Sequence, residues 1–287
     1  GAGTPPTPAL NQTGGPSFSF DLGAANAALK ELYDDQKIQN LVYKNNPFLA
    51  MVPKMEEFGG KYMPIPLIVN TSQGRSATFS NAQGNQTAAT VESFALTRAS
   101  NYSIAQIDNQ TMLASKTDKM AFINGATVVI DGAIRALTNS LATQLFRDGT
   151  GALATIGAWN AVTGVVTLSN PSDITAFEVN MTVETRSPVS PYPVTSSAQA
   201  YIVAVNRTAG TFTVSGSMGG TAGFAWGPSV GDTVNVVGDF NLALKGLSAW
   251  LPVNSPGSTD SFFGVNRSVD PTRLGGVRFN GSSESIE

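Results

Sequence analysis

The stretch that decides the fold runs from residue 115 to residue 149 and reads SKTDKMAFINGATVVIDGAIRALTNSLATQLFRDG. Its large apolar residues recur at steps of three and four, which is the period of one face of an α-helix. These residues are Ile123, Ala126, Ile130, Ile134, Leu137, Leu141 and Leu145. The pattern predicts a helix over 115–148. At 1.5 Å per residue its length is about 50 Å, several times that of a typical globular helix.

Both ends of this stretch carry boundary signals. Ser115 and Asp118 have the spacing of a capping box, and Gly149 follows Arg147 where a C-terminal stop is expected. A helix of this length fits either a coiled coil or a helix laid across a sheet. The steps are compatible with a coiled coil, but the flanking positions are nearly uncharged and lack the e/g pairing that specifies one. The pattern therefore favours a long helix on a sheet.

The residues before this helix predict an extended β-hairpin over 61–110. Lys61 to Val69 has the pattern of a strand, which two prolines confine to an edge position. Apolar residues of one parity predict a second strand over 92–107. The tip between them, Asn70–Thr90, is small and polar and carries one charge, Arg75. Two strands are marginally stable alone, so the hairpin needs a surface, either on another subunit or, as a mobile loop, on its own chain.

The N-terminal 45 residues predict an arm. Residues 1–20 are rich in proline and glycine, which is typical of extended or disordered chain. Residues 22–44 have helical periodicity, and Asn46-Pro47 ends it because the residue before a proline avoids the α region. This helix could dock on a neighbouring subunit or pack on its own core, and the pattern does not distinguish the two.

Residues 155–245 change to short β-branched runs separated by turn signals. We expect strands at Val165–Leu168, Phe177–Val183, Tyr201–Val205, Thr211–Val214 and Thr233–Val237. One pattern occurs twice: an Asn-to-Gly turn that leads into a strand, at Asn160–Gly164 and at Asn206–Gly210. Regular short strands with such turns predict a small all-β barrel or sandwich.

The last segment, 246–287, returns to mixed character. Prolines lie among Gly, Ser and Thr, and charge is concentrated in Arg267, Asp270, Arg273 and Arg278. The segment is either a solvated loop or a network of ion pairs that fixes a subunit contact.

Composition excludes most catalytic chemistry. The 287 residues contain no Cys and no His, so thiolate catalysis, Ser–His–Asp triads and the common zinc sites are impossible. A carboxylate hydrolase using Asp108 and Asp118 remains conceivable, but no spacing singles these residues out. There is no phosphate-binding loop, no metal or cofactor motif, and no apolar run long enough to span a membrane. We expect neither an enzyme nor a cofactor.

The order of arm, hairpin, long helix and β module resembles tailed-bacteriophage major capsid proteins of the Hong Kong 97 fold. The most specific local likeness is Asp260–Arg278, DSFFGVNRSVDPTRLGGVR, which is similar to a stretch that recurs in phage capsid proteins. The resemblance implies an α+β fold with five parts. These are an N-terminal arm and helix (1–45), a peripheral domain with the spine helix (46–60 and 111–154), an extended loop (61–110), an inserted β-barrel-like domain (155–245), and a return to the main fold (246–287) with the axial domain missing or truncated.

The resemblance also implies a function. Such proteins assemble into hexamers and pentamers of an icosahedral head that encloses double-stranded DNA, with scaffolding, portal and decoration proteins as partners. They assemble in the host cytoplasm and end in the virion. Net charge is −3, so no basic patch for sequence-specific DNA binding is expected. The tip has no Lys, so the cross-linking of some members is not expected here. A phage or bacterial surface or decoration module, binding a ligand through its β domain, is the alternative.

Subunit contacts are predicted on the hairpin and on the C-terminal segment. The predicted interface residues are Arg75, Phe79, Arg98, Arg267, Asp270, Arg273 and Arg278.

Overall fold

The computed structural model describes residues 46–53, 59–106, 119–196, 198–222 and 226–279. The described chain mixes helix with two antiparallel sheets. It divides into two compact units, residues 1–45 with 103–136 and residues 46–102 with 137–287. The expected arm over 1–20 and helix over 22–44 lie outside the described residues.

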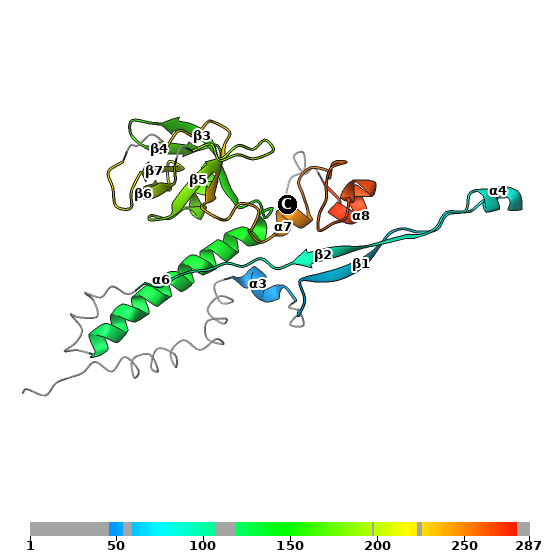
Figure 1. Cartoon of the computed structure of the whole chain (residues 1–287), viewed down its shortest axis with the longest axis horizontal. Helices are drawn as coiled ribbons and strands as arrows, with labels where there is room; N and C mark the ends of the chain where they lie inside the picture. The colour runs from blue at the N-terminus through cyan, green and yellow to red at the C-terminus, as the bar shows by residue number, and fades with distance from the viewer. Residues whose placement is uncertain (1–45, 54–58, 107–118, 197, 223–225, 280–287) are drawn as a thin grey trace, which may run out of the picture. The chain divides into compact units, whose positions relative to one another are not determined.

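The long helix is α6, Lys119–Phe146, with 28 residues (Figure 1). It ends two residues before the predicted boundary, where the Arg147 N–H donates to the Gln144 carbonyl and Gly149 takes a positive φ of 86°. The predicted cap at 115–118 lies outside the described residues. At its C-terminal end α6 meets the short helix α3, Pro47–Met51, through the rings of Phe48 and Phe146 at 5.2 Å.

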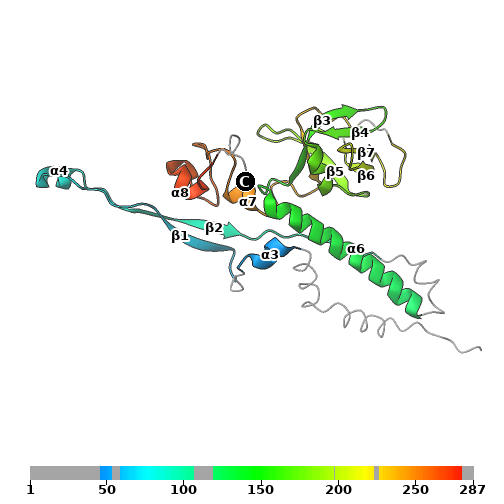
Figure 2. The ribbon, with the colours of Figure 1, turned by 180° about the vertical axis from the view of Figure 1, so that it is seen from behind.

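The hairpin consists of β1, Tyr62–Asn70, and β2, Thr90–Thr97, which pair antiparallel from Tyr62↔Thr97 to Ile68↔Val91. A short helix that the sequence did not predict, α4, Phe79–Gly84, lies at its tip (Figure 2). The expected second strand over 92–107 is too long. Thr97 is paired with the first residue of β1, so no residue lies opposite the chain beyond it; instead the Asn101 side chain donates to Ser140 Oγ.

The β module is a closed barrel of six antiparallel strands, in the order β3-β4-β7-β6-β5-β8. Their bounds are Ala152–Asn160, Val165–Leu168, Thr182–Arg186, Ala200–Asn206, Thr211–Ser215 and Thr233–Val236 for β3 to β8. Closure leaves no open sheet edge.

Both predicted Asn-to-Gly turns are confirmed. The Asn160 side chain accepts from the N–H groups of Val162 and Thr163, and the Asn206 side chain accepts from that of Ala209. Gly164 and Gly210 end these turns at φ of 69° and 64°, a region that favours glycine. The turns connect β3 to β4 and β6 to β7.

The expected strand at Phe177–Val183 is wrong over most of its length. Pro171–Ala176 forms the 3-10 helix η1, and β5 begins only at Thr182. Asn180 takes a positive φ of 72°, which breaks the extended backbone between them. An apolar residue occurs at position 177 because its ring fills the barrel interior, although the residue lies outside the strands. Phe177 is fully buried and stacks on Phe212, with ring centroids 4.8 Å apart.

The barrel interior is filled by side chains. Fully or almost fully buried are Ile156, Val166, Phe177, Val183, Ile202, Phe212, Val214, Trp226 and Val234. The Trp226 indole N–H donates to the carbonyl of Ala198, so its polar atom is also satisfied inside. The barrel therefore holds the main hydrophobic core of the described residues.

The C-terminal segment is mostly irregular. It contains the single-turn helix α7, Leu247–Trp250, the 3-10 turn η2, Arg267–Val269, and the short helix α8, Pro271–Gly275. Loops connect them, and the isolated bridge Phe262↔Val265 closes a tight turn.

Candidate functional site

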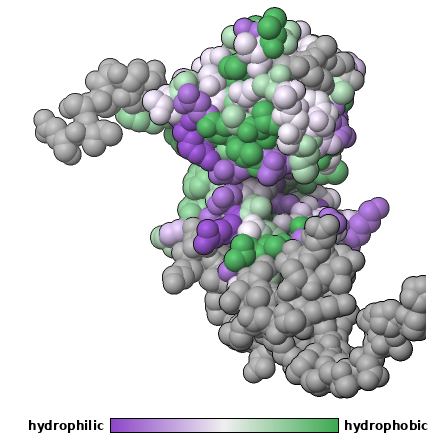
Figure 3. Space-filling model, turned by 90° about the vertical axis from the view of Figure 1, so that its left-hand side faces the viewer, coloured by the Kyte–Doolittle hydropathy of each residue, from purple (hydrophilic) through white to green (hydrophobic). Residues whose placement is uncertain are grey.

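The described part of the chain offers surfaces for association rather than a catalytic cluster. Within that part no group of three or more acidic side chains lies close enough to hold a metal ion. Large apolar side chains reach the surface at many places, and Figure 3 shows them among polar residues on one face of the molecule. The candidate site is therefore the hairpin and the segment packed against its base.

The base of the hairpin packs on the C-terminal segment. Along β1 the odd-numbered residues from Met63 to Val69 are at least partly buried and the even-numbered ones are exposed. On β2 the Phe94 ring meets those of Trp250 and Phe262 edge-on, at 5.7 and 6.0 Å. These contacts give one face of the ribbon the apolar partner that two strands require.

The two edges of the ribbon differ in the backbone N–H groups that they present. The Ala95 N–H faces away from β1 and donates to the Phe263 carbonyl at 2.9 Å. Ala95 is paired with Pro64, so Pro64 and Pro66 also face outward on the opposite edge, where they have no N–H to offer. The edge position that the prolines predicted for this strand agrees with this two-stranded pairing.

Arg267 is buried inside the C-terminal segment, with 5% of its surface exposed. Its guanidinium donates to both carboxylate oxygens of Asp260, at 2.7 and 3.2 Å, and to the carbonyl of Ala249 at 2.8 Å. It also lies 4.0 Å from the centre of the Phe262 ring. We predicted Arg267 at a subunit interface; in the structure its charge pairs with Asp260 within the chain and joins the loop after α7 to η2.

Asp270 and Arg273 belong to α8. The Asp270 carboxylate caps this helix by accepting from the Arg273 N–H at 3.1 Å and the Thr272 hydroxyl at 2.9 Å. The Arg273 backbone N–H, with the Thr272 hydroxyl, holds the pKa of the Asp270 carboxyl below its usual value. The Arg273 guanidinium donates to the Val69 carbonyl at 3.2 Å, which ties α8 to the end of β1.

Arg278 also bonds within its own chain, to the carbonyls of Pro252 at 3.0 Å and Gly276 at 3.1 Å. Within the predicted charged group Asp270 and Arg273 form an ion pair at 3.8 Å, whereas Arg267 pairs with Asp260 and Arg278 donates to backbone carbonyls. The bonds described here hold the segment and the ribbon together, and a role at a subunit contact stays a prediction.

Of the other predicted interface residues, Arg75 and Phe79 lie on the tip, and Arg98 follows β2 at the opposite end of the hairpin. All three are exposed, Phe79 with 82% of its surface. The hydrogen bonds described for residues 70–93 stay within the hairpin; one example is the Thr90 N–H to the Asn70 side chain at 2.7 Å. The tip is thus ordered by its own polar groups while its one aromatic ring faces solvent.

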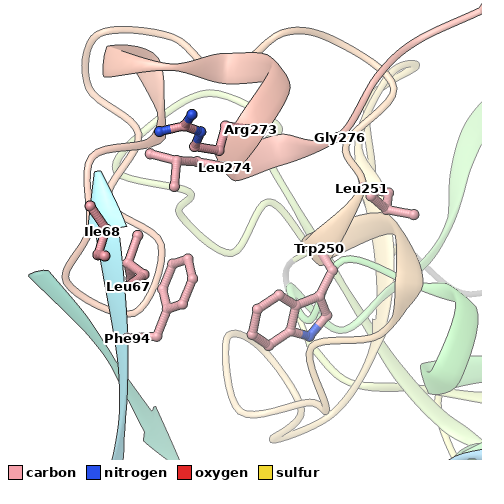
Figure 4. A pocket seen from close by; sticks show the side chains of 8 residues that line it. All are labelled: Leu67, Ile68, Phe94, Trp250, Leu251, Arg273, Leu274 and Gly276. Atoms are coloured by element: carbon pink, nitrogen blue, oxygen red, sulfur yellow. The ribbon is translucent and has the colours of Figure 1, made fainter. Parts of the chain in front are cut away.

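A pocket of about 390 Å³ lies where the ribbon meets the C-terminal segment (Figure 4). Its lining residues are Leu67, Ile68, Phe94, Trp250, Leu251, Arg273, Leu274 and Gly276. Leu67 and Phe94 face it from the ribbon, and Trp250 faces it from α7. Of these residues the sequence singled out only Arg273 as interfacial, because nothing local indicates that Leu67 and Leu274 meet.

Comparison of the chain with protein-family models, with curated proteins and with solved structures finds no match. Among the described helices, none has the length and apolar character needed to cross a membrane.

Proposed function

We propose that the chain is the major subunit of a tailed-bacteriophage head with the Hong Kong 97 fold. In this role it assembles into hexamers and pentamers of an icosahedral shell around double-stranded DNA. The observation that carries the proposal is the hairpin: a two-stranded ribbon, anchored at one end, whose other end presents an exposed aromatic ring. Along the chain the hairpin precedes the long helix and the β module, and this is the order on which the resemblance rests.

The ribbon has more apolar surface than its own chain covers. Tyr62, Ile68 and Val91 are more than half exposed on the ribbon itself, and Phe79 is exposed at its tip. An isolated two-stranded ribbon is marginally stable in water. A neighbouring subunit on this face would supply the missing burial, which supports a role in a lattice of identical chains.

Charge supports the same role. Only 13% of the residues are charged and the net charge is −3. Interface cores are depleted in charge, and a container gains nothing from binding its DNA tightly. Scaffolding, portal and decoration proteins would be the partners of such a subunit, and the virion its destination.

The alternative, a surface or decoration module that binds a ligand through its barrel, receives less support. The barrel interior is occupied by buried side chains such as Ile156, Phe212 and Trp226, so a ligand would have to bind on the outside. Ligand binding by the barrel is therefore measured in the test below.

The test is the particle mass of the purified protein, measured by sedimentation velocity with negative-stain imaging. We expect rings or shells far heavier than the 29.8 kDa chain, and we expect deletion of residues 72–88 to leave soluble single subunits. Thermal unfolding of the deletion variant serves as the control, because the barrel should keep its transition. A monomer at every concentration, with ligand binding by the barrel, would instead support the alternative.

A further inference from the structure

We infer that the pocket at the base of the hairpin receives the hairpin tip of a second copy of this chain, and that Phe79 is the side chain that enters it. The inference rests on the proposed function, because it names the contact through which one subunit holds the ribbon of the next.

The tip has a single group suited to an apolar pocket. Phe79 is the only aromatic residue between 70 and 93, and the rest of α4 is Ser80, Asn81, Ala82, Gln83 and Gly84. An aromatic ring left 82% exposed adds nothing to the stability of its own chain. Aromatic anchors that enter a pocket carry much of the binding energy of protein interfaces.

The pocket has the size and walls for such a ring. An apolar cavity of about 150 Å³ is enough to bind benzene, and this one measures about 390 Å³. Phe94 and Trp250 line it and already meet edge-on at 5.7 Å. A third ring packed beside them would add edge-to-face contacts as well as burial.

Hydrogen-bond donors rather than charge pairing would hold the tip here, because Arg273 is the only charged residue that lines the pocket and the tip between 70 and 90 carries Arg75 and no carboxylate. A guanidinium has five N–H donors, so the bond to the Val69 carbonyl and the ion pair with Asp270 at 3.8 Å still leave donors for the occupant. Arg273 can stack on the incoming ring and donate to the carbonyls at the C-terminal end of α4, which lack helical partners.

The occupant must come from another copy. Leu67 and Ile68 line the pocket and belong to the same ribbon that carries the tip. The pairing ends just beyond them, at Asn70↔Thr90, and the two chain segments continue from there to α4 (Figure 1), so the ribbon holds its tip away from its own base. Because tip and pocket are different surfaces, the contact is head-to-tail, and such contacts close into rings or continue as open chains.

The absence of native cysteine permits a direct test by cross-linking. One preparation carries Ser80→Cys beside the anchor and a second carries Ile68→Cys at the rim of the pocket. The control is Tyr62→Cys, on the same strand and the same face, with 56% exposure against 57% for Ile68, but outside the pocket. Mild oxidation of the mixed full-length chains is expected to join position 80 to position 68 at least about tenfold faster than to position 62, because a disulfide requires Cα atoms within about 7 Å.

An assembly experiment tests the same contact without covalent chemistry. Phe79→Lys removes the anchor and Ile68→Lys blocks the pocket, so each is expected to raise the concentration needed for assembly at least about tenfold, as for loss of an interface anchor. Mixing the two variants is expected to give one-to-one dimers that grow no further, because one tip and one pocket remain. Val162→Lys, in an exposed barrel turn and with 87% exposure against 82% for Phe79, should assemble like the wild type.

Phe79→Tyr should retain assembly, since the ring is kept. Normal assembly by Phe79→Lys, or equal cross-linking to positions 68 and 62, would overturn the inference while leaving the shell function intact; the pocket would then belong to another occupant, such as residues 1–45 or a small apolar ligand. Selective cross-linking without rings or shells would support the contact and remove the shell function.

Discussion

The barrel and the hairpin are both antiparallel β-structure, yet they meet the need for burial in opposite ways. The barrel closes its sheet from β3 to β8 and fills the interior with side chains such as Phe212 and Trp226. The hairpin has two strands and an open sheet, and only one face of its base is covered, by Phe262 and Trp250. The barrel is complete within one chain, while the hairpin depends on what surrounds it.

The difference bears on the proposed function. A closed and filled barrel can be inserted without altering the rest of the chain, since its two connections meet: the Asn241 N–H and the Asn235 side chain both donate to the Thr150 carbonyl. The ribbon instead exposes apolar side chains that a single chain leaves in water. Exposed apolar surface of this kind is what the proposed association between subunits requires.

The largest expected effect comes from separating the two regions. A fragment of residues 148–246 is expected to fold alone with a cooperative thermal transition and an unfolding free energy of about 5 kcal/mol, the lower end for small domains. A fragment of residues 59–102 is expected to show no such transition, because a lone ribbon is marginal. Circular dichroism during heating measures both. A cooperative transition in the hairpin fragment, or none in the barrel, would break the comparison.

The next effect concerns one aromatic residue in each region. Phe212→Ala is expected to lower the unfolding free energy by about 3–5 kcal/mol, because it leaves a cavity in a packed core. Phe212 is 1% exposed and stacks on Phe177. Phe79→Ala is expected to stay within about 0.5 kcal/mol of the wild type, as surface substitutions do. Urea denaturation of dissociated protein measures both, and comparable losses would show that Phe79 is part of a core.

The sequence predicted the parts that local rules govern. The 3–4 period predicted α6, and an Asn followed four residues later by Gly predicted both barrel turns, because a side-chain acceptor and a positive φ are local requirements. The polar tip was predicted as a loop, but α4 was missed: six residues without a strong cap or an apolar face give no periodic signal. The excessive lengths at 92–107 and 177–183 arose because the extent of a strand depends on its partner.

The candidate site was harder to predict, because its contacts join distant residues. The charge of Arg267, Asp270, Arg273 and Arg278 was visible, but burial of Arg267 against Asp260 depends on how loops fold over Phe262. The pocket needs Leu67 and Leu274 to meet across about two hundred residues, which no short pattern encodes. Phe79, by contrast, was predicted as an interface residue on the polar tip; its ring is exposed in the structure, and its role at an interface stays a prediction.

A substitution in the C-terminal segment that packs on the base of the hairpin should cause an intermediate loss of unfolding free energy. Arg267→Ala is expected to lower the unfolding free energy by about 3 kcal/mol or more, because it leaves Asp260 without its buried partner. The matched control is Arg207→Ala, since the Arg207–Glu178 pair is about half exposed and surface pairs contribute about 1 kcal/mol or less. Chemical denaturation compares the two. Equal losses of unfolding free energy would mean that the buried Arg267–Asp260 pair stabilises the C-terminal segment no more than an exposed pair stabilises the barrel.

The smallest expected effect is the response of two carboxyls to pH, one beside each region. Hydrogen bonds at α8 lower the pKa of Asp270 from its usual 3.8, and burial raises the pKa of Asp239, which follows β8 at the exit from the barrel. A lowered pKa contributes stability that is present above pH 3.8 and is lost as pH falls through the folded value. A raised pKa has the opposite sign: stability is lost as pH rises from 3.8 through the folded value.

Asp270→Asn and Asp239→Asn should therefore shift the pH dependence of unfolding in opposite directions between about pH 2 and pH 6. At neutral pH Asp270→Asn is expected to be less stable than the wild type, and Asp239→Asn is expected to be more stable. Urea midpoints across this range provide the measurement, and each variant serves as the control for the other. Shifts of the same sign would show that the cap of α8 does not hold the Asp270 carboxylate in its charged form. The hydrogen bond from Arg273 of α8 to the Val69 carbonyl of the ribbon would then not depend on that charge.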